Sequence, residues 1–112
     1  MTLTELVTIL KMSGIPVAQY EIKQTDYPYI VYQELNDALL FASGKPYARS
    51  VEIGIELHSK AKNPINKLMK TLNKNDLFPV VRTVYLEDNK STIDQMEVTI
   101  IESLGGIDHE SD

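Results

Sequence analysis

The clearest pattern along the chain is a strict alternation of apolar and polar residues between positions 49 and 58. The apolar members of this run are Val51, Ile53, Ile55 and Leu57, and the polar members are Ser50, Glu52, Gly54, Glu56 and His58. A period of two directs one set of side chains to each face of a strand. One apolar and one polar face are typical of an antiparallel sheet that is covered on one side only. The pattern therefore predicts such a strand over residues 49–58.

Four other segments are predicted to be extended. Residues 29–32 are β-branched or aromatic and follow Pro28, which cannot donate to a strand ladder. Segments 80–87 and 91–101 flank residues 88–90, and this spacing is typical of a hairpin. Residues 17–22 form a further extended candidate before a turn at 24–26.

The segment between residues 36 and 47 is predicted to be a loop with a short extended piece. Asn36 and Asp37 have side chains that favour turns, and residues 43–46 contain Ser43, Gly44 and Pro46. We expect a turn at 36–37, an extended piece at 39–42 and a second turn at 43–46.

Two helices are predicted, one at each side of the strand cluster. Thr2 and Glu5 have the spacing of a capping box, and the apolar positions that follow recur at helical intervals until Gly14. The second helix is predicted to have Asn63 as its cap and to end near Asn75. Its apolar stripe consists of Ile65, Leu68, Met69 and Leu72.

This order of elements predicts an α+β fold. We expect one antiparallel or mixed β-sheet of about four to five strands, with two helices packed on one face. A chain of 112 residues suits one hydrophobic core, so residues 1–104 are expected to form a single domain. Residues 105–112 contain little to bury and are expected to form a flexible C-terminal tail.

Charge and composition narrow the range of partners. The chain has 16 acidic and 11 basic residues and a formal charge of −5, which repels a phosphate backbone, so nucleic-acid binding is not expected. No apolar run suits a signal peptide or a membrane span, and we expect a protein made in the cytoplasm without a membrane partner. A basic cluster stands out, and it is either a solvated helix face or a dock for an acidic protein. Its members are Lys60, Lys62, Lys67, Lys70 and Lys74.

Side chains for catalysis or metal binding do not gather in any recognisable motif. Cysteine is absent, and His58 and His109 are predicted to be solvated residues without companions. Carboxylates such as Glu52 and Glu56 alternate along a strand, which is typical of its wet side, and Glu87 with Asp88 is an equally weak pair. We therefore expect no enzyme activity, no cofactor and no metal site.

Exposed apolar residues give the best candidate for a functional surface. Large apolar side chains in the predicted loop either fold back onto their own core or become buried when another subunit arrives. Two tyrosines beside Pro28 either belong to an interface, where such rings are enriched, or lie at the edge of the core. The candidate oligomer or partner interface consists of Leu39, Leu40, Phe41, Tyr47, Tyr27 and Tyr29.

The layout resembles the tail-completion or head–tail joining proteins, similar to tail terminators, of long-tailed phages and prophages of Gram-positive bacteria. The resemblance covers residues 3–101 and rests on hydrophobic pattern and short phrases. After the opening helix come Gly14, Ile15, Pro16, Val17, Ala18 and Tyr20, then Tyr27, Pro28, Tyr29, Ile30, Val31 and Tyr32. The strand that ends in Ile55, Glu56 and Leu57, the helix that opens with Asn63 and Pro64, and a final hairpin complete the layout.

The resemblance implies a structural subunit of the virion that acts by assembly. Such a subunit is expected to form a ring, as a hexamer, at the head–tail junction and to contact the phage connector and tail-tube proteins. It implies neither cofactor nor catalysis and assigns no role to single residues. The alternative function is a small-ligand or regulatory binding domain with a pocket between sheet and helices, where tyrosines supply the polar groups.

Overall fold

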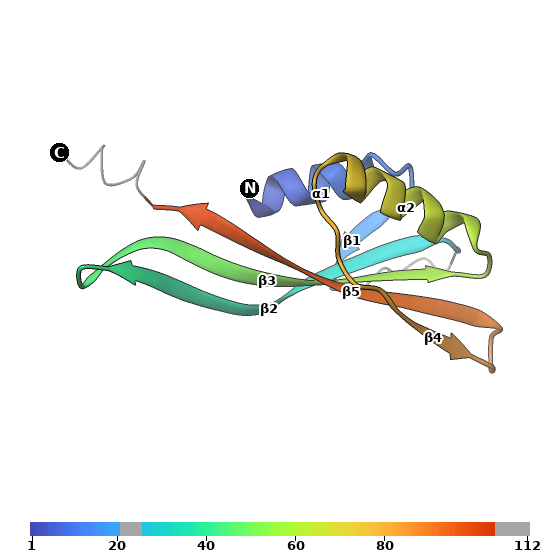
Figure 1. Ribbon diagram of the computed structural model, residues 1–112. Helices are drawn as coiled ribbons and strands as arrows, with labels where there is room; N and C mark the ends of the chain where they lie inside the picture. The colour runs from blue at the N-terminus through green and yellow to red at the C-terminus, as the bar shows by residue number, and fades with distance from the viewer. Residues whose placement is uncertain (21–25, 105–112) are drawn as a thin grey trace.

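Five strands form one mixed sheet in the order β1-β2-β3-β5-β4. The strands are β1 Val17–Gln19, β2 Tyr29–Ala42, β3 Lys45–Ser59, β4 Arg82–Leu86 and β5 Ser91–Ser103. β1 runs parallel to β2, while β2–β3, β3–β5 and β4–β5 are antiparallel pairs. The computed structural model describes residues 1–20 and 26–104 (Figure 1). The predicted tail at 105–112 lies outside these residues, as do residues 21–25, which include most of the predicted turn.

Two helices, α1 Leu3–Lys11 and α2 Asn63–Lys74, lie on one face of the sheet (Figure 1). The predicted α+β class and the single-sided helix layer are therefore confirmed. The predicted capping box is present, because the Glu5 amide donates to Thr2 Oγ1 at 3.1 Å and the Thr2 amide donates to Glu5 Oε1 at 3.2 Å. The prediction that Asn63 caps α2 is wrong, since Lys62 holds that position and makes no side-chain capping bond.

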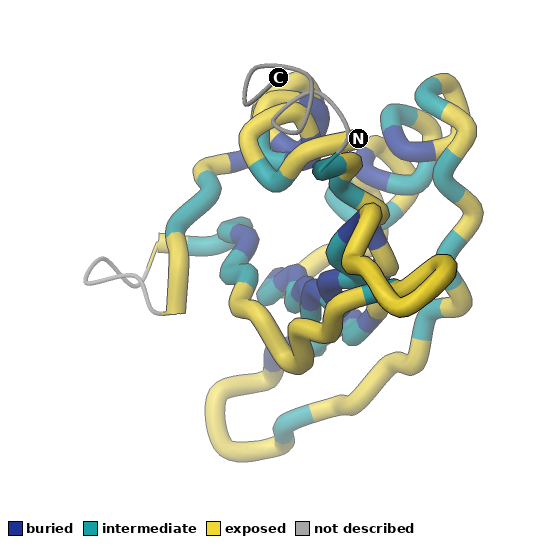
Figure 2. Tube along the Cα trace, turned by 90° about the vertical axis from the view of Figure 1, so that its left-hand side faces the viewer, coloured by how far each residue is buried: buried dark blue, intermediate teal, exposed yellow. Residues whose placement is uncertain are grey.

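The hydrophobic core lies between the helices and the sheet (Figure 2). β3 contributes alternate residues to it, as its sequence pattern predicts, and β5 contributes alternate residues beside them. The core consists of Leu6, Ile9, Leu10, Ile15, Ile30, Val51, Ile53, Ile55, Leu57, Leu68, Leu72, Met96, Val98 and Ile100. In the described part of the chain no helix covers the opposite face of the sheet, which is called the open face below (Figure 1).

The predicted turn at Asn36 and Asp37 is wrong, because β2 runs without a break from Tyr29 to Ala42. A register shift between Glu34 and Asn36 leaves Leu35 as an extra residue, which is a β-bulge. Turn-forming side chains fit here since the strand is exposed at this point and the Asp37 carboxylate has a partner across the ladder in Arg49. The extended piece at 39–42 is confirmed as the end of the same strand.

The bulge reverses the faces of β2. Residues that oppose each other in an antiparallel pair point to the same side. Tyr32 opposes the buried Ile55, whereas beyond the bulge Asp37 opposes the buried Val51 and Leu39 opposes Arg49. Even-numbered residues therefore face the helix side before Leu35, and odd-numbered residues face it afterwards.

Both hairpin loops lie where the sequence predicts turns, but their bounds differ. The predicted turn at 43–46 is reduced to Ser43 and Gly44, because residues 45 and 46 already belong to β3. Ser43 and Gly44 have φ values of 55° and 78°, the pair of positive angles that a two-residue type I′ turn requires. The loop between β4 and β5 spans residues 87–90, one residue more than predicted. β4 itself is shorter than the predicted 80–87 segment, because residues 80 and 81 belong to the connection from α2.

We predict that the stability of the fold depends strongly on the packing of the helices and only weakly on the side chains of β2 in the arm half of the strand. Leu72 is fully buried in α2, so Leu72→Ala is expected to lower the free energy of unfolding by about 2–5 kcal/mol. The matched control, Leu39→Ala, removes the same atoms from a side chain that is 49% exposed and is expected to change it far less. Urea denaturation followed by circular dichroism measures both, and an equal loss for the two variants would contradict this separation.

Candidate interaction surface

The β2–β3 hairpin extends past the N-terminal end of α1 and forms an arm, defined here as residues 36–50 (Figure 1). The molecule is elongated, with principal dimensions of 55 × 26 × 24 Å. The far end of the arm, residues 39–48, consists of the two hairpin strands and the turn between them. This arm contains four of the six residues that the sequence predicts for an interface.

Three of these four residues are exposed, so they do not fold back onto the core of their own chain. Leu39, Phe41 and Tyr47 expose 49%, 59% and 49% of their surface, and none of them belongs to the core cluster. Leu39 faces the helix side, whereas the half-buried Leu40 opposes Ala48 on the open-face side. Nearer the turn, Phe41 opposes Pro46. The arm is therefore apolar on both faces, and its own fold leaves much of that surface uncovered.

The arm has very little charge near its tip. From residue 38 to residue 48 the sequence contains a single charged residue, Lys45, which flanks the turn. No carboxylate lies in this stretch. An apolar tip with one cation suits a partner surface that is itself apolar and edged by acidic groups.

A set of polar contacts fixes the base of the arm. Arg49 and Asp37 form an ion pair across β2 and β3, in which Arg49 Nε donates to Asp37 Oδ1 at 3.2 Å. Glu102 lies opposite Arg49 on β5 and accepts a hydrogen bond from the Leu3 amide at 3.2 Å. The Leu104 amide donates to the Tyr47 carbonyl at 2.9 Å. These bonds tie the start of α1 to β5, and the residue that follows β5 to the arm.

The hydrogen bond from Arg49 lowers the pKa of the Asp37 carboxyl below its usual value, and the guanidinium charge adds to this effect. These two effects outweigh the partial desolvation, which acts in the opposite direction. The ion pair is solvent-exposed, so it orients the arm more than it stabilises the fold.

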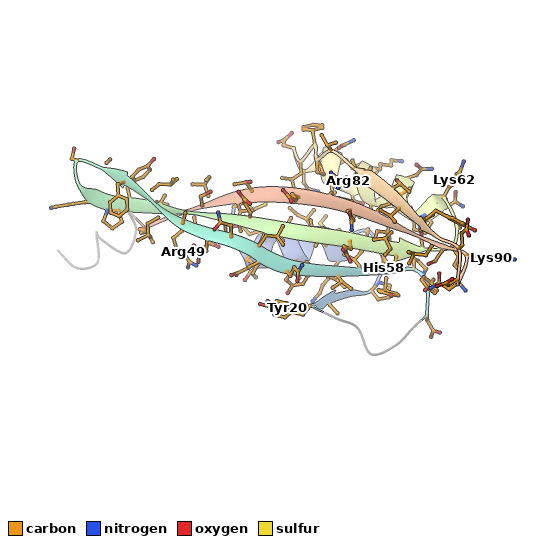
Figure 3. All side chains as sticks on the ribbon, turned by 90° about the horizontal axis from the view of Figure 1, so that it is seen from below. Tyr20, Arg49, His58, Lys62, Arg82 and Lys90 are labelled. Carbon is orange, nitrogen blue, oxygen red and sulfur yellow. The ribbon has the colours of Figure 1, made fainter. Side chains whose placement is uncertain are left out.

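Tyr27 and Tyr29, the other two predicted interface residues, lie at the opposite end of the sheet. The register places Tyr29 against His58 and Leu39 against Arg49, which are separated by about 30 Å along the strand. Figure 3 shows Arg49 and His58 well apart along the sheet. The sequence grouped six residues in one interface, and the structure divides them between two places.

The two tyrosines belong to an aromatic and polar chain on the open face. Their ring centroids are 5.5 Å apart, and the Tyr29 ring stacks on His58 at 4.7 Å. His58 Nε2 lies 3.1 Å from Glu56 Oε1, and Gln95 donates to Glu56 Oε2 at 3.3 Å. Burial raises the pKa of the Tyr29 hydroxyl, and repulsion from Tyr27 and Glu56 adds to the rise. The prediction of a solvated His58 without companions is therefore wrong, and His109 lies outside the described residues.

The open face also contains a hollow of about 630 Å³ that the sequence did not reveal. Gly54 lies in its lining, and a Cβ atom at this position would approach Leu35 Cδ1 to 3.0 Å. The hollow is lined by Tyr20, Val31, Gln33, Leu35, Gly54, Ile55, Glu56, Val80, Arg82, Gln95, Met96 and Glu97. Figure 3 views this face and shows Arg82 and Tyr20 near its two sides. A glycine within the polar row of residues 50–58 was the available signal for this site.

A second exposed apolar patch lies beside the hollow, on the connection between α2 and β4. It consists of Phe78 and Val80, which expose 72% and 88% of their surface, and is called the linker patch. Val80 also lines the hollow. The linker patch is therefore separate from the apolar surface of the arm.

The carboxylates and histidine singled out by the sequence lie apart from any cluster of three metal-ligating side chains in the described residues. Among residues 1–20 and 26–104, no group of three or more His, Asp or Glu side chains is placed to hold a metal ion. Glu56 is hydrogen-bonded to His58 and Gln95, while Glu87 and Asp88 lie in the β4–β5 loop. No helix in the same residues has the length and apolar character needed to cross a bilayer.

We predict that the carboxyl of Asp37 titrates below its usual range because Arg49 stabilises its charged form. Since this pKa is lowered on folding, the contribution of the pair is complete above the ordinary pKa of aspartate and is lost as the pH falls through the lowered value. In Arg49→Gln the titration is expected to return toward the ordinary range. NMR titration of the carboxyl carbon measures the shift, and an unchanged midpoint in Arg49→Gln would contradict the assignment.

We compared the sequence with families of known proteins and with curated proteins. Neither the models of protein families nor the curated proteins include a match to this sequence. The arm, the hollow and the linker patch are therefore the features that indicate a function.

Proposed function

We propose that this protein is a structural subunit of the head–tail junction of a long-tailed phage or prophage. It acts as a ring-forming tail-completion or connector subunit, by association with copies of itself and by docking to the connector and tail-tube proteins. The observation that carries the proposal is the arm, which presents Leu39, Phe41 and Tyr47 to solvent. The place of action is the virion, after synthesis in the host cytoplasm.

An exposed apolar arm is a costly feature for a protein that works alone. Large exposed apolar surfaces promote association, and proteins that keep them normally bury them against a partner. Ring assembly suits the shape, because a ring repeats a contact between two different surfaces of the same chain. The arm is one such surface, and it lies at one end of an elongated molecule.

The free strand edge of the arm supports the same proposal. β1 pairs with β2 only at Ile30–Tyr32, and the Tyr20 amide extends this contact to the Tyr32 carbonyl. Within residues 1–20 and 26–104, no strand pairs with the outer edge of β2 beyond Tyr32. Uncovered strand edges attract other chains, and assembly subunits use them to add contacts.

The layout on which the phage resemblance rests is compatible with the fold. The opening helix, the short strand β1, the long strands β2 and β3, the helix α2 and the final β4–β5 hairpin follow in the order that the resemblance requires. The hexameric state and the neighbours in the virion are part of the proposal. An overall charge of −5 is suited to a ring through which DNA passes without binding.

The hollow supports a second candidate function, the binding of a small ligand. Its volume of about 630 Å³ is within the range of ligand pockets, and it combines apolar walls with Gln33, Glu56 and Arg82. The phage proposal is preferred because the hollow does not explain the exposed arm. A thermal-shift screen of metabolites tests this candidate, and stabilisation by one compound that Gly54→Leu abolishes would favour it.

We predict that the arm is required to join heads to tails. Deleting the gene in the phage or prophage that encodes it is expected to leave separate heads and tails in electron micrographs. A wild-type copy restores joined particles, whereas a copy with Leu39→Ser and Phe41→Ser is expected to fail, because the arm then loses the apolar surface that it buries in the assembly.

The control is Met12→Ser, which changes an apolar residue at the end of α1 that is even more exposed, and it is expected to restore joining. Circular dichroism checks that all variants are folded, and light scattering of the pure chains gives their oligomeric state. Joined, infectious particles without the gene would overturn the proposal. So would a wild-type chain that stays monomeric at high concentration and binds neither connector nor tail-tube proteins.

A further inference from the structure

We propose that the tip of the arm of one copy seats in the open-face hollow of the next copy. This inference rests on the proposed self-association and adds the identity of the receiving surface. The arm tip is defined as residues 39–48, and the hollow is the one around Gly54. The occupant is a second copy of the chain, for three reasons of geometry and charge.

The first reason is that the arm cannot reach the hollow of its own chain. β3 is continuous from Lys45 to Gly54, and these nine steps along the strand separate the two by about 30 Å. The same continuous strand belongs to the arm and to the lining of the hollow, so the sheet itself holds the tip away from it. Any arm tip in the hollow therefore comes from another molecule.

The second reason is that the hollow has an apolar floor at which aromatic and aliphatic side chains fit. Val31 and Leu35 contribute apolar atoms, and the Leu35 side chain lies over Gly54. Val80, the most exposed of the large hydrophobic residues in the described chain, stands at the same site. The arm tip contributes the exposed side chains of Phe41, Leu39 and Tyr47. In the contact, the apolar side chains of the tip and those of the hollow would therefore cover each other.

The third reason is complementary charge. The tip contains Lys45 and no carboxylate, whereas Glu56 and Glu97 both line the hollow. Arg82 is the single basic residue among the lining side chains. Glu97 is exposed, while Glu56 is already hydrogen-bonded, so Glu97 is the group that is free to face an incoming Lys45.

The contact joins two unlike surfaces and is therefore heterologous. A heterologous contact that repeats under a closing rotation builds a ring, and one between two identical arms builds only a dimer. The arm and the hollow lie on different parts of an elongated molecule, which leaves each copy free to give one contact and receive another.

Disulfide trapping tests the proposal directly, because the natural chain contains no cysteine. Lys45→Cys and Glu97→Cys are introduced singly and together, and the assembled protein is treated with a mild oxidant. The double variant is expected to give a ladder of covalent oligomers up to the full ring on denaturing gels. A mixture of the two single variants is expected to give only dimers, and either variant alone is expected to give none.

The single variants exclude the competing arrangements. Efficient dimers from Lys45→Cys alone would show that two arms meet, and this result would overturn the proposal. Rings that persist in light scattering while the double variant fails to cross-link would also overturn it and would leave the self-association intact. A chain that never associates would instead remove the self-association on which the proposed ring depends.

Charge exchange gives a second measurement that does not depend on cysteine geometry. Lys45→Glu and Glu97→Lys are each expected to weaken association about two- to fivefold, as befits a single exposed ion pair, and the two changes together are expected to restore it. The control is Lys90→Glu in the β4–β5 loop, which lies at the far end of the sheet from the arm (Figure 3). Equal weakening by the control, or no recovery in the double variant, would count against the contact.

Discussion

Burial of a single face of β3 is the constraint on which the rest of the structure depends. β3 has β2 on one side and β5 on the other, so its alternating residues decide which side of each neighbour points toward the helices. Val51 and Leu57 anchor the helix side, and the polar residues between them are left on the open face. The two helices cover only part of this long strand (Figure 1), and for that reason the same chain has both a core and an arm.

Local patterns predicted most of the fold because they report on burial. The alternation of residues 51–57, the Thr2 and Glu5 capping box and the two helices all appear as expected. The bulge at Leu35 was missed because it depends on how β2 pairs with Gly54 and its neighbours, which no local pattern contains. Asn36 and Asp37 favour a turn in isolation, but the ladder to β3 and the pairing of Asp37 with Arg49 keep them extended.

The candidate surface was predictable only in part, for a related reason. Composition is enough to show that Leu39, Phe41 and Tyr47 need a cover, but only the strand register shows that Tyr27 and Tyr29 are elsewhere. The hollow arises from residues on four strands and the α2–β4 connection, brought together by pairing over long sequence distances. The proposed contact between copies joins a feature that the sequence indicates with one that only the fold creates.

The Ser43 and Gly44 turn has a consequence for how such a surface can diverge. A two-residue turn with positive φ at both residues is a tight connection between the two strands. The hairpin therefore has a fixed length, and the same positions of its sequence always point outward. The residues at those positions contribute nothing to the core of their own subunit. Mutations can therefore change the side chains of the tip, and with them the partner that it binds, while the rest of the fold holds the tip in the same position.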